Sequence, residues 1–364
     1  MRLLPEQRPL WRALDSRTRT LIASAVALVA LLAVAFLLPV PYVKLAPGPT
    51  FNVIGEVDGT SVIEIEGTET FPVTGQIDMT TVSESGGPRG GLTFVEAIAA
   101  WLNPSDAVVP RELLYPDEVS ADELRERGAA LFSTAESDAI GAALNYLGLP
   151  SAREVVVTAV VSDTPAEGIF EPRDRIRAIN GTEITSPADV VEAVQSAPVG
   201  TEFSVDVDRN SEATSFTVTS AANPDNEGKP YIGISVGEYF TPDFRVDFTL
   251  QDIGGPSAGL IFAAGLIDKL TPDNITGGGH VAGTGTISPD GTVGPIGGIR
   301  QKLAGARDSG AEIFLMPAKH CAEAEGFIPD GLTVVPLETL DDAMAALEAW
   351  RKGEPLESCP ASAD

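Results

Sequence analysis

The chain has 364 residues, of which 52 are acidic and 24 are basic, and its formal net charge at pH 7 is −28. Such a body repels phosphate backbones, which excludes nucleic-acid binding. Because only two histidines are present, histidine-rich zinc sites and His-Glu-x-x-His peptidases are also excluded, and any histidine-based triad has to use one of the two. At roughly 100–200 residues per domain, the length predicts two domains and a core that folds without disulfides.

Residues 21–40 form an apolar stretch without charges. About 20 helical residues span the roughly 30 Å hydrocarbon layer, so the stretch predicts a transmembrane helix. Residues 1–19 carry +3, leaving −31 for the rest, and only Lys44 follows the stretch closely. This bias predicts a cytoplasmic N-terminus (residues 1–20) and an extracytoplasmic body. The alternative is a cleaved signal peptide, because Ala33-Val34-Ala35 has the small-x-small form, although the stretch exceeds the roughly 7–15 residues of a signal core.

Cys321 and Cys359 are the only cysteines in the chain. Outside the cytoplasm they could form a disulfide. Two unrelated thiols remain the alternative, because a sequence does not establish the distance between them.

The elements that follow the apolar stretch are predicted from local patterns. Proline and glycine punctuate residues 41–60, which favours a stalk. Residues 61–82 place apolar side chains at even spacings, which predicts strands. Thr93-Phe94-Val95-Glu96 has the form of a capping box and opens a short helix that ends near Asn103-Pro104. A second helix, acidic and rich in alanine, is expected over residues 120–147.

Residues 152–222 carry the signals of a small mixed domain. A β-branched run at 155–161 predicts a strand, Ser186-Pro187-Ala188-Asp189 caps a helix, and residues 203–208 alternate as a half-buried strand does. Three motifs follow in order, namely Ser162-Asp163-Thr164-Pro165-Ala166-Glu167-Gly168, Asp174-Arg175-Ile176 and Ile179-Asn180-Gly181. With these motifs the segment resembles a PDZ domain of the bacterial protease-associated type.

This resemblance implies that the segment binds an extended peptide by adding it as a strand to a sheet edge. The alternative is a PDZ fold that serves only as a spacer, because a fold alone does not establish binding. The chain departs from the family at Glu171-Pro172-Arg173-Asp174, where such domains usually read Pro-Gly-Asp. Beyond it, alternating apolar residues at 232–236 and 244–248 predict two strands, which we assign to the section that follows.

Ser257 lies in the glycine-rich run Gly254-Gly255-Pro256-Ser257-Ala258-Gly259. Residues 260–270 are apolar on nearly every face, which predicts a buried helix with Ser257 at its N-terminus. Unpaired N–H groups at a helix start suit stabilisation of an oxyanion, so Ser257 is a candidate nucleophile. The alternative is a serine that only caps the helix.

A nucleophilic serine needs a base. Residues 255–259 satisfy the G-x-S-x-G pattern of α/β-hydrolases, but His280 and His320 follow Ser257 by only 23 and 63 residues and no His-Gly-Gly oxyanion loop precedes it. Among the six lysines, Lys302 lies at an apolar helix start after Gly297-Gly298. Burial there would lower its pKa and make it a workable base near neutral pH, whereas a solvated lysine is the alternative.

Together these motifs closely resemble the proteolytic domain of Lon. The matching segments are Gly255–Gly259, Gly283-Thr284-Gly285-Thr286-Ile287, Gly291–Ile299, Lys302 and Gly310–Pro317. With the apolar stretch and the PDZ segment, the chain resembles the membrane-anchored Lon-PDZ peptidases of Gram-positive and actinobacterial type.

The resemblance implies a Ser–Lys dyad, with Ser257 as nucleophile and Lys302 as general base. It gives supporting roles to Thr284, Gly255 and Pro256. Lon has an acidic residue three positions before the serine, where this chain has Gly254, so Asp252 is only a further supporting candidate.

The resemblance also predicts an α+β fold with an N-terminal transmembrane helix and a PDZ domain inserted in or preceding the Lon-type domain. The expected segments are 61–104 (first part of the peptidase domain), 105–151 (helical connection), 152–222 (PDZ), 230–352 (catalytic part) and 353–364 (tail).

The expected function is that of a membrane-anchored serine endopeptidase. The chain has no G-x-x-x-x-G-K-[ST] loop, which indicates cleavage without ATP of extended exported peptides or small membrane-tethered proteins, presented by the PDZ segment. We expect membrane lipid as a partner through residues 21–40, no cofactor and no metal, and homo-oligomerisation stays open. The alternatives are a catalytically silent PDZ scaffold and an esterase-type α/β-hydrolase.

Overall fold

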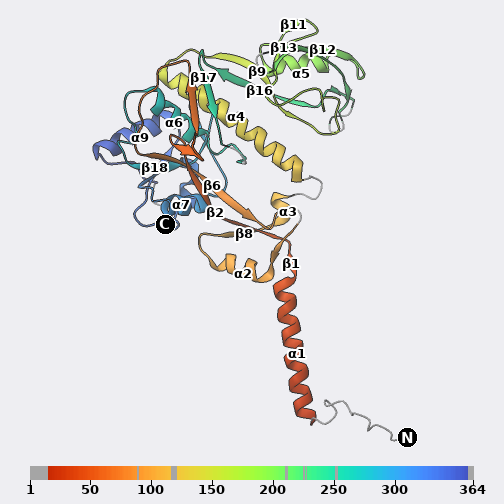
Figure 1. The fold of residues 1–364 in the computed structure, drawn as a ribbon, viewed down its shortest axis with the longest axis vertical. Coiled ribbons are helices and arrows are strands. Elements are labelled where there is room, and N and C mark those ends of the chain that lie inside the picture. The colour runs from red at the N-terminus through yellow and green to blue at the C-terminus, as the bar shows by residue number, and fades with distance from the viewer. Residues whose placement is uncertain are drawn as a thin grey trace. The chain divides into compact units, whose positions relative to one another are not determined.

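A computed structural model gives the fold, and it describes residues 15–87, 90–115, 121–209, 212–223, 226, 228–250 and 253–359. The chain forms two compact units, and Figure 1 labels their helices and strands. The first consists of Met1–Ala46 and Glu84–Glu118, and the second of Pro47–Ser83 and Val119–Asp364.

The first unit contains the apolar helix α1 (Ser16–Leu37), capped by Asp15. Its segment Ser16–Val34 is long and apolar enough to cross a membrane. A signal sequence near the N-terminus would have the same length and composition. The helix ends earlier than residue 40 because Pro39 lacks the N–H that helical continuation needs. The remaining elements are β1 (Pro39–Val40), β7 (Leu92–Thr93), α2 (Phe94–Leu102), β8 (Ala107–Pro110) and α3 (Arg111–Leu114).

Residues 41–60 differ from the stalk we expected. They form β2 (Tyr42–Asn52) and a hairpin of β3 (Glu56–Val57) and β4 (Thr60–Ser61). Apolar side chains on either side of Pro47 and Pro49 explain the difference, because Val43 and Val53 are fully buried.

The main sheet of the second unit combines a parallel strand that precedes the PDZ-like segment in the sequence with parallel strands that follow it. Strand β18 (His280–Gly283) pairs with β6 (Gln76–Ser85) on one side and with β21 (Ile313–Pro317) on the other. Strand β22 (Thr333–Leu337) continues the sheet beyond β21, and β2 follows β6. The predicted strand at 244–248 is β17 (Arg245–Phe248), which pairs with β5 (Ile63–Glu66).

Helix α6 (Gly259–Leu270) forms the centre of the core beside this sheet. Ten of its 12 residues are buried, which confirms the predicted buried helix. Helices α4 (Ala121–Leu147) and α9 (Leu340–Lys352) contact it. The smaller elements of this part are α7 (Ile299–Asp308), α8 (Cys321–Ala324), β19 (Thr286–Ile287) and β20 (Val293–Gly294).

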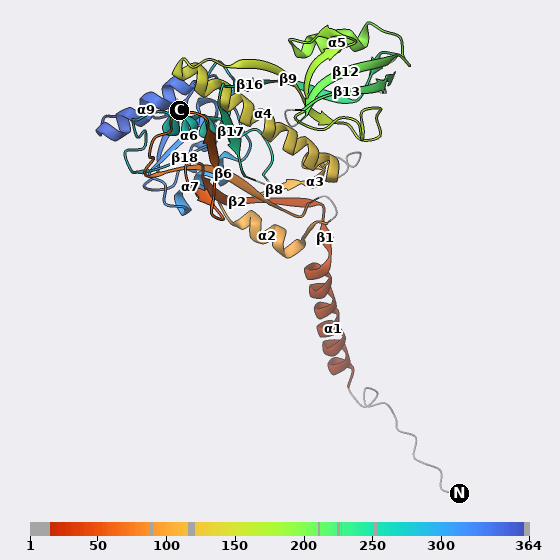
Figure 2. The same cartoon turned by 45° about the horizontal axis from the view of Figure 1, so that its top comes forward.

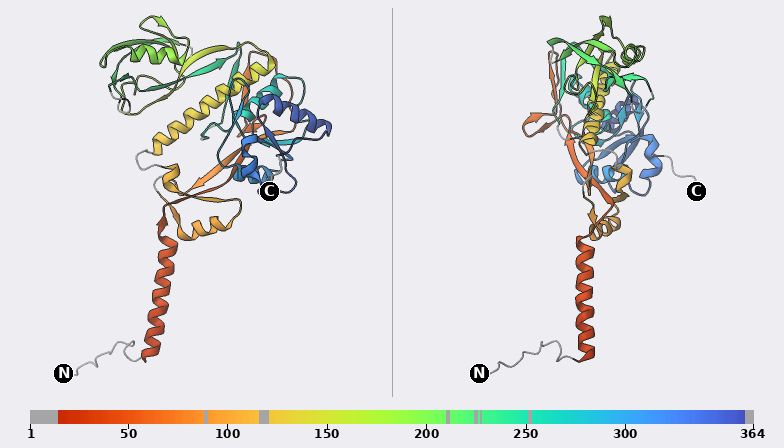
Figure 3. Two further views of the ribbon diagram at one scale, coloured as in Figure 1. Left: turned by 180° about the vertical axis from the view of Figure 1, so that it is seen from behind. Right: turned by 90° about the vertical axis from the view of Figure 1, so that its right-hand side faces the viewer.

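A separate antiparallel sheet has the order β13-β12-β10-β9-β16 (Figures 2 and 3). Its elements are β9 (Ala152–Val160), β10 (Arg175–Ile179), β11 (Thr182–Glu183), α5 (Pro187–Gln195), β12 (Glu202–Arg209), β13 (Glu212–Thr219) and β16 (Ile234–Thr241), with β14 (Ala221–Ala222) and β15 (Pro230–Tyr231) nearby in sequence. Our assignment of the strand at 232–236 to the catalytic part was wrong, because β16 pairs with β9 along its length. Alternation predicts a strand but not its partner.

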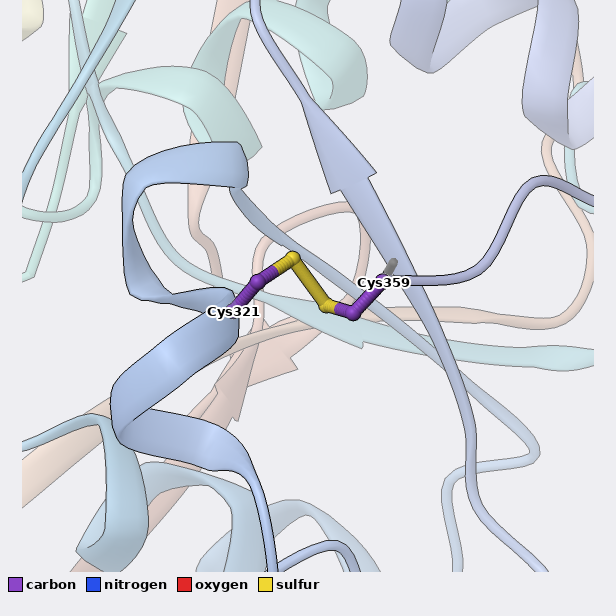
Figure 4. The surroundings of a disulfide bond; sticks show 2 residues. All are labelled: Cys321 and Cys359. Carbon is purple, nitrogen blue, oxygen red and sulfur yellow. A yellow bond between two sulfur atoms is a disulfide. The ribbon is translucent and has the colours of Figure 1, made fainter. Parts of the chain in front are cut away.

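The structure pairs the two cysteines whose distance the sequence left open. Cys321 and Cys359 form a disulfide with their Cα atoms 5.4 Å apart (Figure 4). The bond ties the segment after α9 to α8.

Candidate active site

Ser257 lies on the turn that leads into α6. Gly255 has a φ of +90°, a backbone conformation that favours glycine. The N-cap of α6 is Ala258, and no side chain caps the helix, so the interpretation of Ser257 as a simple cap is wrong. The backbone N–H groups of Ser257 and Ala258 have no hydrogen-bond acceptor among the described residues.

Lys302 comes to Ser257 from α7. The helix begins after Gly298, whose φ of 72° also lies in the left-handed region that favours glycine. The Lys302 side chain is 3% exposed, and its Nζ donates to Ser257 Oγ at 2.8 Å. Burial lowers the pKa of Lys302 to about 7, because an apolar environment disfavours the charged ammonium. A solvated lysine at this position is therefore ruled out.

Thr284 forms hydrogen bonds with both Lys302 and the backbone of Ser257. It follows β18, is fully buried, and accepts a hydrogen bond from Lys302 Nζ at 2.8 Å. Its own Oγ1 donates to the backbone oxygen of Ser257 at 3.0 Å. One hydroxyl therefore positions both the amine and the turn that carries Ser257.

The other supporting candidates contribute less. Gly255 and Pro256 are half-buried in the turn before Ser257, and Asp252 lies outside the described residues. No group of three or more His, Cys, Asp or Glu side chains that could hold a metal occurs in the described part of the chain.

Both histidines have partners other than Ser257. His280 Nε2 lies 2.9 Å from Asp78 Oδ2, and His320 Nε2 accepts from the backbone N–H of Ile296 at 2.9 Å. Ser257 Oγ instead contacts an amine. The geometry disfavours the α/β-hydrolase alternative, which needs a histidine beside the serine.

Two family models match the chain. Residues 132–219 match the PDZ domain, and residues 251–348 match the Lon protease (S16) C-terminal proteolytic domain. The chain carries a PDZ domain and a Lon-type proteolytic domain. The second match includes Ser257, Thr284 and Lys302, and it supports peptidase activity.

Solved structures resemble the PDZ part. A crystal structure of the PDZ domain of the SdrC-like protein from Listeria monocytogenes is 24% identical, covering 23% of this chain and 86% of that one, with a TM-score of 0.21. The corresponding domain from Listeria innocua is 26% identical, covering 23% of this chain and 92% of that one, also with a TM-score of 0.21. No curated protein matches the chain significantly.

Within the second unit, a cavity of about 1350 Å³ is lined by residues of the PDZ domain, of α4 and of β17. Its lining reaches Leu250 and Ile253, shortly before Ser257, but does not include Ser257 or Lys302. The charged lining residues are Asp58, Glu126, Glu136, Glu167 and Arg173. The charged side chains of the lining are therefore mainly acidic, whereas most of its other residues are apolar.

One ion pair in this cavity was not predicted from the sequence. Arg173 Nη2 on the PDZ domain lies 3.0 Å from Glu136 Oε2 on α4. Glu136 is 5% exposed, and burial raises its pKa to about 7 although Arg173 opposes the shift. Arg173 stands where the resembled domains have glycine, and its φ of 75° lies in the left-handed region that favours glycine. This replacement was the signal in the sequence that the turn is unusual.

Proposed function

We propose that the chain is a serine endopeptidase with a Ser257–Lys302 dyad. The observation that carries the proposal is the 2.8 Å hydrogen bond from the Nζ of a buried lysine to Ser257 Oγ. A lysine with a pKa of about 7 is neutral in a large fraction of molecules at physiological pH and can accept a proton.

In the proposed reaction, neutral Lys302 removes the proton of Ser257 as Oγ attacks a peptide carbonyl. The backbone N–H groups of Ser257 and Ala258, which have no acceptor within the described part of the chain, donate to the resulting oxyanion. Lys302 then protonates the leaving amine, and water attacks the acyl-enzyme to regenerate Ser257. Thr284 keeps the amine directed at Oγ.

The proposed substrates are extended exported peptides and small membrane-tethered proteins, cleaved without ATP. The chain has no phosphate-binding loop of the Walker type, so nothing in it resembles the motor that unfolds substrates for Lon. The cavity lined by both PDZ and peptidase residues supports the proposal that the PDZ domain presents the substrate.

We further propose that α1 is an uncleaved single-pass anchor with a cytoplasmic N-terminus and an extracytoplasmic body. The five arginines of residues 1–19, which precede the apolar stretch, support this orientation. The disulfide between Cys321 and Cys359 also supports it, because disulfides persist mainly outside the cytoplasm.

The test compares purified full-length protein with its Ser257→Ala and Lys302→Ala variants on unfolded casein and on small acyl esters. We expect both variants to lose casein cleavage, while Lys319→Ala, which removes an exposed lysine, retains it. Activity that survives in the Ser257→Ala/Lys302→Ala double variant would refute the dyad. Cleavage of esters alone would favour the esterase, and a folded wild type that cleaves neither would favour the silent scaffold.

A further inference from the structure

Helix α2 carries an exposed apolar face in the first unit. Its members are Phe94 (49% exposed), Ile98 (41%), Trp101 (77%) and Leu102 (71%). Their spacing of i, i+4, i+7 and i+8 places all four on one side of a helix. We call these four residues the α2 face.

The rest of α2 differs from this face. Ala100 is the buried residue of the helix, and Glu96, its only charged residue, is used in the capping box with Thr93. Leu113 on α3, the next helix in the sequence, is 70% exposed and adds to the apolar surface of the same unit. A soluble surface seldom gathers such side chains on one helix, so the face has to be covered by something.

The position of α2 indicates what covers it. Strand β1 follows α1 directly and pairs with β7, whose Thr93 is the N-cap of α2. The two helices are in contact, and α2 lies beside the C-terminal end of α1 and runs across its direction (Figures 1 to 3). A membrane that contains α1 therefore has its surface at the level of α2.

We propose that the α2 face lies in the interfacial layer of the lipid bilayer on the extracytoplasmic side. This inference depends on the proposal that α1 spans the membrane. Short helices with one apolar face lie in this layer, and tryptophan is enriched there because its ring is apolar and its N–H is polar.

Lipid suits the face better than a protein partner does. A protein interface surrounds its apolar centre with a rim of directional polar contacts. On the α2 face, the indole N–H of Trp101 is the only polar side-chain group. Contact with lipid also needs no separate binding event, because α1 holds α2 at the bilayer surface in every inserted molecule.

The test uses the full chain in vesicles of phosphatidylcholine and phosphatidylglycerol, with nitroxide labels on single cysteines introduced at Glu96, Ile98, Trp101, Val29 and Val191. The native cysteines are paired and do not react. Accessibility to oxygen, which concentrates in lipid, is compared with accessibility to a water-soluble nickel chelate. Val29 on α1 reports the anchor, and Val191, an exposed residue of α5, reports water.

We expect labels at Ile98 and Trp101 to be more accessible to oxygen, and the label at Glu96 to be more accessible to the chelate. The depth of the labels in the bilayer should therefore vary with the period of the helix. A Val29 label outside lipid would overturn the anchor itself. A Val29 label in lipid with chelate-accessible labels at Ile98 and Trp101 would overturn only the α2 proposal. Labels at these two positions that both reagents fail to reach would show a protein partner instead.

Discussion

At the scale of single residues, Lys302 predicts the pH dependence of the reaction. With a pKa of about 7, Lys302 is protonated at lower pH and cannot act there as the proposed base. We expect kcat/KM on an unfolded peptide to rise with pH to a plateau, with an apparent pKa of about 7. A profile that is flat between pH 5.5 and 8.5 would contradict a lysine base. Lys302→Arg should lose about 100-fold or more, because arginine stays protonated.

The same lysine lowers the stability of the fold. Its pKa is about 7 in the folded state. In the unfolded chain it is about 10.4, so unfolding takes up a proton between these values. The loss of folding stability caused by the buried ammonium is fully present below pH 7 and disappears as the pH rises towards 10. We therefore expect Lys302→Met to raise Tm most at or below pH 7, and the gain over wild type to shrink in alkaline buffer. Unchanged Tm at both extremes would show that Lys302 is solvated.

Thr284 predicts a positioning effect that a structural role alone would not produce. Thr284→Val keeps the shape of the side chain but removes both of its hydrogen bonds, to Lys302 and from the hydroxyl to Ser257 O. At about 1–1.5 kcal/mol for such a bond, we expect kcat to fall about 10-fold, with little change in KM. Thr284→Ser should restore most of kcat. An equal loss in the serine variant would indicate packing rather than positioning.

The sequence singled out Ser257 and Lys302 through glycine turns that precede apolar helices, and the resemblance to Lon added Thr284. The structure brings the hydroxyls of Ser257 and Thr284 within hydrogen-bond distance of Lys302 Nζ. The ion pair of Glu136 and Arg173 could not be predicted in the same way. Its residues are 37 positions apart, and their contact depends on how α4 packs against the PDZ domain. The sequence showed only that Arg173 replaces the glycine usual in this turn of the resembled PDZ domains, and it did not identify Glu136 as the partner.

At the scale of elements, the turn that carries Arg173 combines backbone strain with this ion pair. Arg173→Gly should relieve about 1 kcal/mol of strain at its φ of 75°. It also leaves the buried Glu136 carboxylate without its cation. Because the pKa of Glu136 is about 7, this loss should appear above pH 7 and vanish at pH 5.5, where Glu136 is protonated. Tm measurements at both pH values test this, and Glu136→Gln/Arg173→Gly should remove the pH dependence.

The disulfide stabilises the segment after α9. Cys321 and Cys359 are 38 residues apart, and closing a loop of that length stabilises by up to about 4 kcal/mol. We expect Cys321→Ser/Cys359→Ser to lower Tm and to make it insensitive to dithiothreitol. The wild type should fall to the same Tm when reduced. If reduction leaves the wild type unchanged, the bond contributes nothing to the stability of this fold.

Strands show the same limit of prediction as the ion pair. Alternating residues predicted the existence of β16 and β17 correctly, because a period of two depends only on local geometry. Their partners depend on packing: β17 pairs with β5 near the N-terminus, whereas β16 forms the edge of the PDZ sheet. Similarly, prolines suggested a stalk where β2 enters a sheet, because buried side chains outweighed the local turn signals.

At the scale of the whole molecule, the proposal of cleavage without ATP predicts which proteins are cleaved. If the dyad acts only on chains that are already extended, a folded substrate is cleaved through its unfolded fraction. We would give the enzyme a series of variants of one small substrate protein that differ in stability but not at the cleavage site. Each loss of about 1.4 kcal/mol should speed cleavage about 10-fold until the substrate is mostly unfolded. Added Mg-ATP should change none of these rates. Rates that ignore substrate stability, or that rise with nucleotide, would mean that the chain unfolds its substrates.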